Sequence, residues 1–242
     1  MNTASVEIIQ SFAPGGVLRA AINLGNPVLA HRNSETREPA GVSVDLAREL
    51  GRRLGVETRL ATFDSAGQVF AVVDGDVWDV AFMAIDPVRA EKIRFTEPYV
   101  IIEGTYMVNA GADFTTVDDV DREGVRVAVG KGAAYDLYLT RALKHAGIVR
   151  APTSATAIDL FVERSLEAVA GVRQPLEAYA ARHPGWRVLD GRFTAIEQAM
   201  AVPKSRVAAW TYLRSFLRDM KADDFIRHAL ARSGQEGATV AP

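Results

Sequence analysis

The sequence of 242 residues contains no cysteine. This absence excludes disulfide bonds, thiolate catalysis and cysteine-ligated zinc, and it leaves the cellular compartment open. Histidine is also scarce: the four histidines stand far apart, and none lies in the HExxH spacing of zinc proteases. We therefore expect no metal centre, and the sequence indicates no cofactor.

An excess of charge of either sign is lacking too. Lysine and arginine number 28 against 30 acidic residues, which gives a net charge of −2. Nucleic-acid binding needs a basic surplus that neutralises phosphates, so we expect no nucleic-acid partner. No apolar run approaches the roughly 20 residues of a membrane-spanning helix, so we expect no membrane insertion. The opening residues, MNTASVE, resemble no secretory signal peptide, which favours a cytoplasmic chain or one whose leader was removed.

Catalytic motifs are missing as well. The sequence has no GxSxG elbow, no GxxxxGK(S/T) phosphate loop and no dinucleotide-binding fingerprint after its first strand. Glu103 and Glu197 are the one candidate acid–base pair, and nothing in the sequence brings them together. We therefore do not expect an enzyme.

What is present is an alternation of strand and helix patterns. Apolar runs predict strands, and apolar residues at helical spacing predict helices between them. In the first part of the chain the order is a strand at 18–22, a helix from Ser43 to Gly55, a strand at 57–63, a helix through 68–73 and a strand at 79–84. This rhythm is typical of a parallel sheet that is covered by helices.

The same rhythm returns in the second part of the chain. Its predicted elements are a strand at 124–129, a helix from about 134 to 146, a helix through 157–162 and a strand at 168–172. In each part the last strand leads to a proline, Pro87 or Pro175, which suits the first turn of a helix because its missing N–H has no partner there. The sequence therefore predicts two similar α/β lobes.

Ligands of open parallel sheets bind where strands end and loops lead into helices. Asn23 and Asn26 follow the first predicted strand, and their amides either bind a ligand or form a turn. Met83 and Ala84 end a later strand, and Arg89 follows them at the start of a helix. An arginine there is favourable when it holds an anion, although it could instead pair with a surface acid such as Glu91.

A glycine turn follows the first strand of the second lobe. The turn at Gly130–Gly132 leads into Ala133 and Ala134, without the third glycine of a dinucleotide loop. We expect Gly132, Ala133 and Ala134 to present backbone N–H groups to a small carboxylate, rather than to a nucleotide.

Three stretches of the chain resemble a known family. The segment PVRAEKIRFTEPY at 87–99 is similar to the TPERAEKVDFSDPY signature of amino-acid-type extracellular solute-binding proteins, the receptors of ATP-driven (ABC) importers. The segment GVSVDLA at 41–47 resembles the family's GFDVDLA, and VAVGKG at 127–132 resembles the opening of its second lobe. The resemblance extends from about Leu18 to Leu230.

The resemblance implies an α/β protein of the two-lobed periplasmic-binding-protein type 2 fold. Each lobe would hold a mostly parallel sheet flanked by helices, and two hinge strands would join the lobes. Lobe 1 would comprise residues 1–103 and 196–242, and lobe 2 residues 104–195. A solute would bind in the cleft between the lobes, which close on it by hinge motion. The resemblance further implies a monomer in the periplasm that delivers its ligand to the membrane permease of an ABC transporter.

Departures from the family pattern bear on the ligand. An arginine at the position of Arg89 holds the ligand α-carboxylate in the family, and this chain keeps it. Alanines stand at Ala84 and Ala133, where the family usually has Ser or Thr. The acid that pairs with the ligand ammonium is replaced by Val172 or Arg173. We therefore expect an organic acid, for instance a dicarboxylate held by Arg89 and Arg173.

Two alternatives stay open at this point. Glu103 or Glu197 could supply the missing counter-charge to an amine ligand, or could act as the cleft acid of a cyclohexadienyl or arogenate dehydratase, enzymes that share the fold. A free-standing ligand sensor without a transporter is the other reading.

Overall fold

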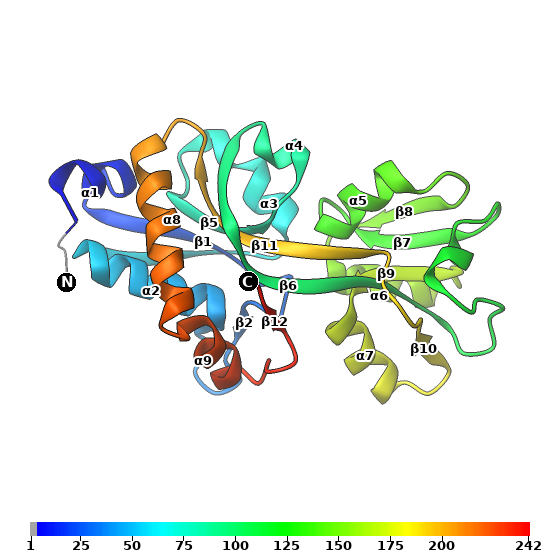
Figure 1. Cartoon of the computed structure of the whole chain (residues 1–242). Coiled ribbons are helices and arrows are strands. Elements are labelled where there is room, and N and C mark those ends of the chain that lie inside the picture. Colours follow the sequence, from blue (N-terminus) through cyan, green and yellow to red (C-terminus); the bar gives the residue numbers. More distant parts are fainter. Residues whose placement is uncertain (1–3) are drawn as a thin grey trace. The chain divides into compact units, whose positions relative to one another are not determined.

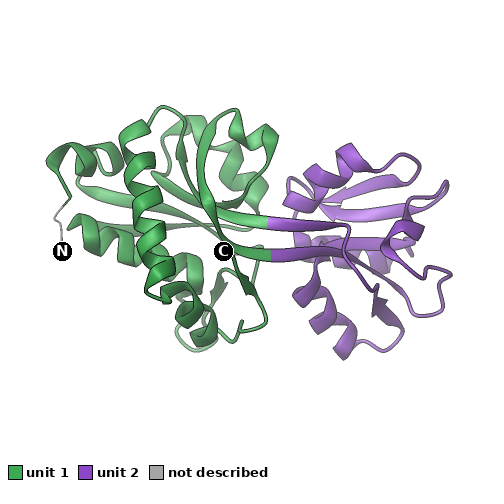
Figure 2. Ribbon diagram, viewed as in Figure 1, with its two compact units in different colours: residues 1–101, 197–242 green, residues 102–196 purple. Residues whose placement is uncertain are grey.

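The computed structural model describes residues 4–242, and the chain divides into two compact units. Unit 1 comprises residues 1–101 and 197–242, and unit 2 comprises residues 102–196 (Figure 2). Two long strands carry the chain from one unit into the other and back: β6 (Ile93–Asn109) and β11 (Thr194–Pro203). Figure 1 follows the chain through these elements.

Unit 1 is built on a sheet with β1 (Val17–Asn23) inside it. Strand β1 pairs in parallel with β4 (Glu57–Phe63) on one side and with β5 (Val80–Ala84) on the other. Strand β11 pairs antiparallel with β5, and the short β12 (Thr239–Val240) pairs antiparallel with β6. A small hairpin joins β2 (His31–Arg32) to β3 (Pro39–Ala40). All five residues of β5 are buried, as expected of a strand inside a sheet.

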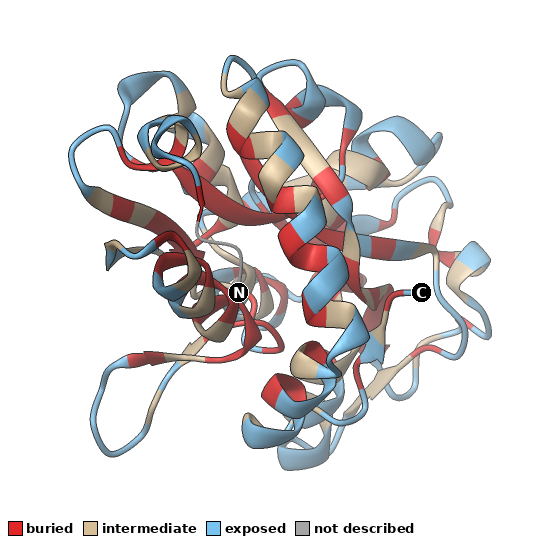
Figure 3. Cartoon of the chain, turned by 60° about the vertical axis from the view of Figure 1, so that its left-hand side comes forward, coloured by how far each residue is buried: buried red, intermediate tan, exposed pale blue. Residues whose placement is uncertain are grey.

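The helices of unit 1 connect and cover these strands. They are α1 (Val6–Phe12), α2 (Val42–Leu54), α3 (Ala66–Ala71), the 3-10 turn η1 (Val73–Gly75), α4 (Pro87–Ala90), α8 (Val207–Ala222) and α9 (Phe225–Arg232). Helix α2 ends at Leu54, and the left-handed backbone of Gly55 caps it, as the sequence predicts. On α8 the buried and exposed residues lie on opposite faces, as Figure 3 shows.

Unit 2 repeats the same strand order. Strand β7 (Arg126–Gly130) lies between β8 (Gly147–Ala151) and β9 (Ala168–Val172), and all three are parallel. Strand β9 and β10 (Trp186–Val188) pair antiparallel with β6. The helical segments are η2 (Val117–Val120), α5 (Ala134–Ala142), α6 (Ser154–Glu163) and α7 (Arg173–Arg182). The predicted α/β class with two similar lobes is thus confirmed.

The predicted helices differ from the observed ones at their ends. Helix α5 stops at Ala142 because the carboxylate of Asp121 accepts hydrogen bonds from the next backbone N–H groups, Lys144, His145 and Ala146. The strand β8 that follows was not predicted. The helix expected through residues 68–73 is α3, which ends at Ala71.

The prediction that both lobes begin a helix at proline is half right. Helix α4 begins at Pro87, and Asp86 caps it by accepting a hydrogen bond from the Val88 N–H at 2.9 Å. Helix α7, in contrast, begins at Arg173, and Pro175 is its third residue. A proline fits there as well, because no N–H of the first turn has an intrahelical acceptor.

A buried carboxylate ties the start of β5 to the rest of unit 1. Asp79 has no exposed surface, and it accepts hydrogen bonds from Arg19 Nε at 2.9 Å and from Arg206 Nη1 at 2.7 Å. Arg206 also donates to the carbonyl of Phe12 at 3.0 Å. One ion cluster thus links β1, β5, α1 and the segment before α8. Because Asp79 is desolvated, its contacts with both arginines offset the cost of burying a carboxylate.

We expect Asp79→Asn to lower the free energy of unfolding by about 3 kcal/mol, because it leaves two arginines without their buried partner. Asp76→Asn is the matched control, since Asp76 contacts the same arginines from an exposed position. Urea denaturation should show a much smaller loss for Asp76→Asn. Equal losses in the two variants would contradict the role assigned to the buried carboxylate.

Candidate functional site

The carboxyl ends of β4, β1 and β5 meet at one edge of the unit 1 sheet. In the register of these strands Asn23 is opposite Phe63, and Ala21 is opposite Ala81. Strand β1 lies between β4 and β5. The connection that leaves β1 leads to β4 on one side of it, and the next connection leads to β5 on the other side, so β1 lies at a topological switch point. The loops after β1 and β5 therefore emerge next to each other, at the place where open α/β sheets bind ligands.

Arg89 is a positively charged residue of this edge, and the fold buries it together with Asp86. It lies in α4, which Asp86 and Pro87 anchor directly after β5, and it is 1% exposed. Its Nη1 donates to the carbonyl of Ala84 at 2.9 Å. Burial lowers the pKa of Arg89 to about 10, and the nearby Asp86 opposes this shift. The guanidinium is therefore charged at neutral pH, and an anion beside it would offset its lost hydration.

Met83 and Ala84 lie at the end of β5, and both are buried. The carbonyl of Ala84 is the acceptor that orients Arg89. The sequence pattern places these residues correctly, but their part in binding a ligand stays a prediction.

The two asparagines after β1 have different surroundings. Asn23 Oδ1 accepts a hydrogen bond from the Gly25 N–H at 3.0 Å, which is the turn role considered from the sequence. Asn26 is buried, and its Oδ1 has no hydrogen-bond partner in the part of the chain that the structure describes. A Cβ at Gly25 would lie 2.4 Å from the carbonyl oxygen of Asp64, so only glycine lets the loops after β1 and β4 approach so closely.

The glycine turn of unit 2 uses its N–H groups differently from the expectation. The Gly132 N–H donates to Asp136 Oδ2 at 2.8 Å, and the Ala133 N–H donates to the carbonyl of Gly130 at 3.0 Å. Asp136 is 3% exposed and also accepts from Arg150 Nε at 2.9 Å. A carboxylate of the chain itself thus takes the donor that was expected to meet a ligand. Ala134 begins α5 and stays a predicted contact.

Arg173 and Glu103 neutralise each other within unit 2. Arg173 Nε donates to Glu103 Oε2 at 2.7 Å, and Arg173 also contacts Glu177 at 3.4 Å. Arg192 Nη1 contacts the other oxygen of Glu103 at 3.1 Å. The hydrogen bond from Arg173 is the main reason why the pKa of Glu103 lies below its usual value, although partial burial opposes this. A second ligand carboxylate on Arg173 would have to compete with Glu103.

Glu197 lies in β11 of unit 1 with an exposed side chain. Its carbonyl accepts a hydrogen bond from the Ile85 N–H at 2.8 Å, directly after β5. The backbone of Glu197 thus fixes the loop that leads to α4.

Sequence reasoning missed the charged partners of unit 2: Asp136, Arg150, Glu177 and Arg192. Asp136 stands four residues after Gly132, a spacing at which an acid can cap a turn, and Glu177 stands four residues after Arg173, the spacing of ion pairs along a helix. Arg150 and Arg192 meet their partners only through folding. Within residues 4–242 there is no group of three or more His, Cys, Asp or Glu placed to hold a metal ion. The described helices include none that is long and apolar enough to cross a membrane.

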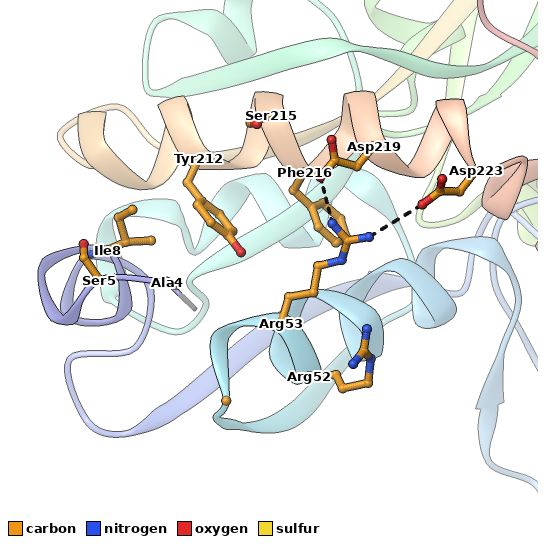
Figure 4. A pocket seen from close by; sticks show the side chains of 11 residues that line it. Ala4, Ser5, Ile8, Arg52, Arg53, Tyr212, Ser215, Phe216, Asp219 and Asp223 are labelled. Atoms are coloured by element: carbon orange, nitrogen blue, oxygen red, sulfur yellow. Dashed lines mark hydrogen bonds and ion pairs between the residues drawn. The ribbon is translucent and has the colours of Figure 1, made fainter. Parts of the chain in front are cut away.

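A separate pocket of about 950 Å³ lies between α1, the end of α2 and α8 (Figure 4). Since α2 runs from the carboxyl end of β1 to the amino end of β4, this pocket is at the opposite edge of the sheet from Arg89. Arg53 points across it to Asp219, with a contact of 2.8 Å, and lies 5.5 Å from the Phe216 ring centroid. Its charges are matched internally, so it is the weaker candidate for a ligand site.

The contacts of Glu103 with arginines allow a test of the alternative in which Glu103 is the acid of a dehydratase. We expect the pKa of Glu103, followed by ¹³C NMR of its carboxyl group, to lie below the usual value of about 4.3. Arg173→Gln should raise it because it removes the main hydrogen bond. Arg182→Gln is the control, since Arg182 donates to a carbonyl of its own helix. A Glu103 pKa near 6 would make this residue a candidate general acid again.

Comparison with known proteins agrees with this fold. The profile of the bacterial extracellular solute-binding proteins, family 3, matches residues 18–234. Among curated proteins, none matches the chain significantly.

Solved structures with the same fold cover nearly the whole chain. An amino acid ABC transporter substrate-binding protein from Streptococcus pneumoniae, bound to L-arginine, is 16% identical with a TM-score of 0.79, covering 97% of this chain and 99% of that one. The cysteine-binding protein from Campylobacter jejuni is 16% identical with a TM-score of 0.80, covering 93% and 92%. The ancestral amino acid-binding protein AncCDT-1, a precursor of cyclohexadienyl dehydratase, is 22% identical with a TM-score of 0.77, covering 93% and 98%.

Proposed function

The chain belongs to the bacterial extracellular solute-binding proteins, family 3, and on that premise we propose that it binds a small carboxylate-bearing solute through Arg89. The resemblance seen in the sequence is thereby confirmed at the level of the family and its fold. The identity of the solute is the finer part of the proposal, and it depends on the residues of this chain.

The observation that supports the proposal is the buried guanidinium at the end of β5. A charged group that is 1% exposed has lost its hydration, and this loss is costly. The carbonyl of Ala84 orients Arg89, and the α4 cap at Asp86 fixes its backbone. A ligand carboxylate accepts two parallel hydrogen bonds from such a planar group, which makes binding both strong and directional.

The contacts within unit 2 favour a solute with one carboxylate. The dicarboxylate expectation required Arg173 as a second clamp, but Glu103 and Glu177 already contact that arginine. The N–H of Gly132, another possible anion donor, is bonded to Asp136. The carboxylates of unit 2 thus occupy the donors that a second anionic group would need.

The proposal keeps a binding role without catalysis. The fold shared with AncCDT-1 does not carry chemistry by itself, because function resides in the site. A general acid must hold a proton near neutral pH, whereas the pKa of Glu103 is lowered by its arginines. The remaining parts of the proposal are the periplasmic location, the permease partner, the monomeric state and hinge closure on the ligand. A ligand-dependent decrease in the radius of gyration would test the closure.

The test compares acids with their carboxamides by thermal shift and titration calorimetry. We expect carboxylates to raise the melting temperature and their neutral amides to leave it unchanged, because a ligand stabilises the folded state that binds it. Arg89→Gln should lower the affinity for the most tightly bound acid by about 10-fold to 100-fold, because charge-assisted hydrogen bonds are lost.

Arg94→Gln is the control for this test. Arg94 lies in the same 87–99 segment, and its Nε donates to the carbonyl of Lys204. The Arg94→Gln variant should bind the acid with the same affinity as the unaltered protein. Unchanged acid affinity in Arg89→Gln, or a panel in which no carboxylate stabilises the protein, would contradict the proposal.

A further inference from the structure

Asn26 holds a buried hydrogen-bond acceptor for which the chain supplies no donor. Of the buried side-chain atoms in the described part of the chain, only Asn26 Oδ1 and Gln174 Oε1 lack a partner. Asn26 is the more enclosed of the two residues, at 9% exposure. An unsatisfied buried polar atom costs stability, so its presence calls for a functional explanation.

The position of Asn26 in the fold indicates that the solute supplies the missing donor. It follows β1, and Arg89 follows β5, which is the parallel neighbour of β1 in the same unit. Both residues therefore belong to loops at the same edge of the sheet, at the topological switch point. A solute carboxylate on Arg89 would thus bring the adjacent solute atoms toward the loop after β1.

The loop fixes the Asn26 backbone. Its carbonyl accepts hydrogen bonds from the N–H groups of Leu29 at 3.0 Å and Ala30 at 3.1 Å. On the other side, the Leu24 N–H donates to the carbonyl of Phe63 at 2.8 Å. The amide oxygen is thus attached to an ordered loop rather than a free one, and a pre-positioned acceptor binds a donor at little entropic cost.

The charge at this edge decides which donor fits. A ligand ammonium needs an anionic counter-charge when it leaves water, and the amide of Asn26 carries none. Among the nearby acids, Asp86 caps α4 and lies close to Arg89, whereas Asp64 and Glu197 have exposed side chains. A hydroxyl group, in contrast, is satisfied by a single neutral acceptor.

We propose that Asn26 Oδ1 accepts a hydrogen bond from a hydroxyl group on the solute whose carboxylate Arg89 binds, so that this protein selects hydroxy acids over amino acids. This inference rests on the proposed function and specifies the class of solute. It makes Asn26 the residue that determines specificity, while Arg89 supplies the affinity for the acid group.

The experiment uses matched sets of three acids that share one carbon skeleton. Each set contains a 2-hydroxy acid, the 2-amino acid and the unsubstituted acid: lactate, alanine and propionate; 3-phenyllactate, phenylalanine and 3-phenylpropionate. In at least one set the hydroxy acid should bind about 10-fold or more tightly than both analogues, because each analogue leaves the Asn26 oxygen or its own ammonium unsatisfied.

Two substitutions at Asn26 test its role. Asn26→Leu should remove the hydroxy acid preference and keep the Arg89-dependent binding of the acid group. Asn26→Asp supplies a counter-charge and should shift the preference toward the amino acid. Asn33→Asp is the control, because Asn33 lies in the same unit and its Oδ1 is bonded to the N–H groups of Glu35 and Thr36.

The outcomes separate the two proposals. Wild-type protein that prefers the amino acid, or Asn26→Leu that keeps the hydroxyl preference, overturns the inference. In either case, loss of binding in Arg89→Gln would leave the proposed function standing. If no acid binds, or if Arg89→Gln binds as well as the wild type, the proposed function fails and the inference fails with it. Circular dichroism of each variant establishes that it is folded.

Discussion

The constraint that organises the binding edge of unit 1 is the burial of one positive charge. Arg89 is enclosed at the end of β5, and its guanidinium is oriented by the carbonyl of Ala84 and lies close to Asp86. Keeping that charge in place requires the cap of α4, the loop held by the Glu197 carbonyl and the completely buried strand before it. The helix, the loop and the strand are local features, and together they place one donor group at the edge where we propose that a small anion binds.

Unit 2 shows the same topology with a different use of charge. Both units place one strand between two parallel neighbours and follow it with a short turn at the switch point. In unit 1 the corresponding edge holds Arg89 and an amide oxygen that has no partner in the described chain. In unit 2 the acids Glu103 and Asp136 are bonded to the arginines Arg173 and Arg150. The charges of unit 2 are therefore matched within that unit, and the anion-binding role that we propose falls to unit 1.

The helices and strands and their order are predicted well from the sequence, because they depend on local patterns of residues. The strands at both switch points, the Gly55 end of α2 and the Asp86–Pro87 start of α4 follow from periodicity, caps and turn residues. The family resemblance follows from the 87–99 segment, and it implies the position of Arg89.

The contacts between side chains could not be predicted from the sequence, and the reason is physical. Arg173 and Glu103 are 70 positions apart and meet only when β9 pairs with β6. The end of α5 is set by Asp121, more than 20 positions earlier, which no periodicity reveals. Asn23 and Asn26 are indistinguishable in sequence, yet one forms a turn and the other retains a buried acceptor. Contacts between distant residues decide specificity, and they exist only in the folded chain.

The most direct test of this account is a crystal structure of the protein with the acid that stabilises it most. The account predicts a carboxylate oxygen within hydrogen-bond distance of the Arg89 guanidinium and a hydroxyl oxygen within the same reach of Asn26 Oδ1. A solute bound elsewhere, for instance in the pocket beside Arg53 and Phe216, or one that leaves Arg89 without an anion, would contradict it.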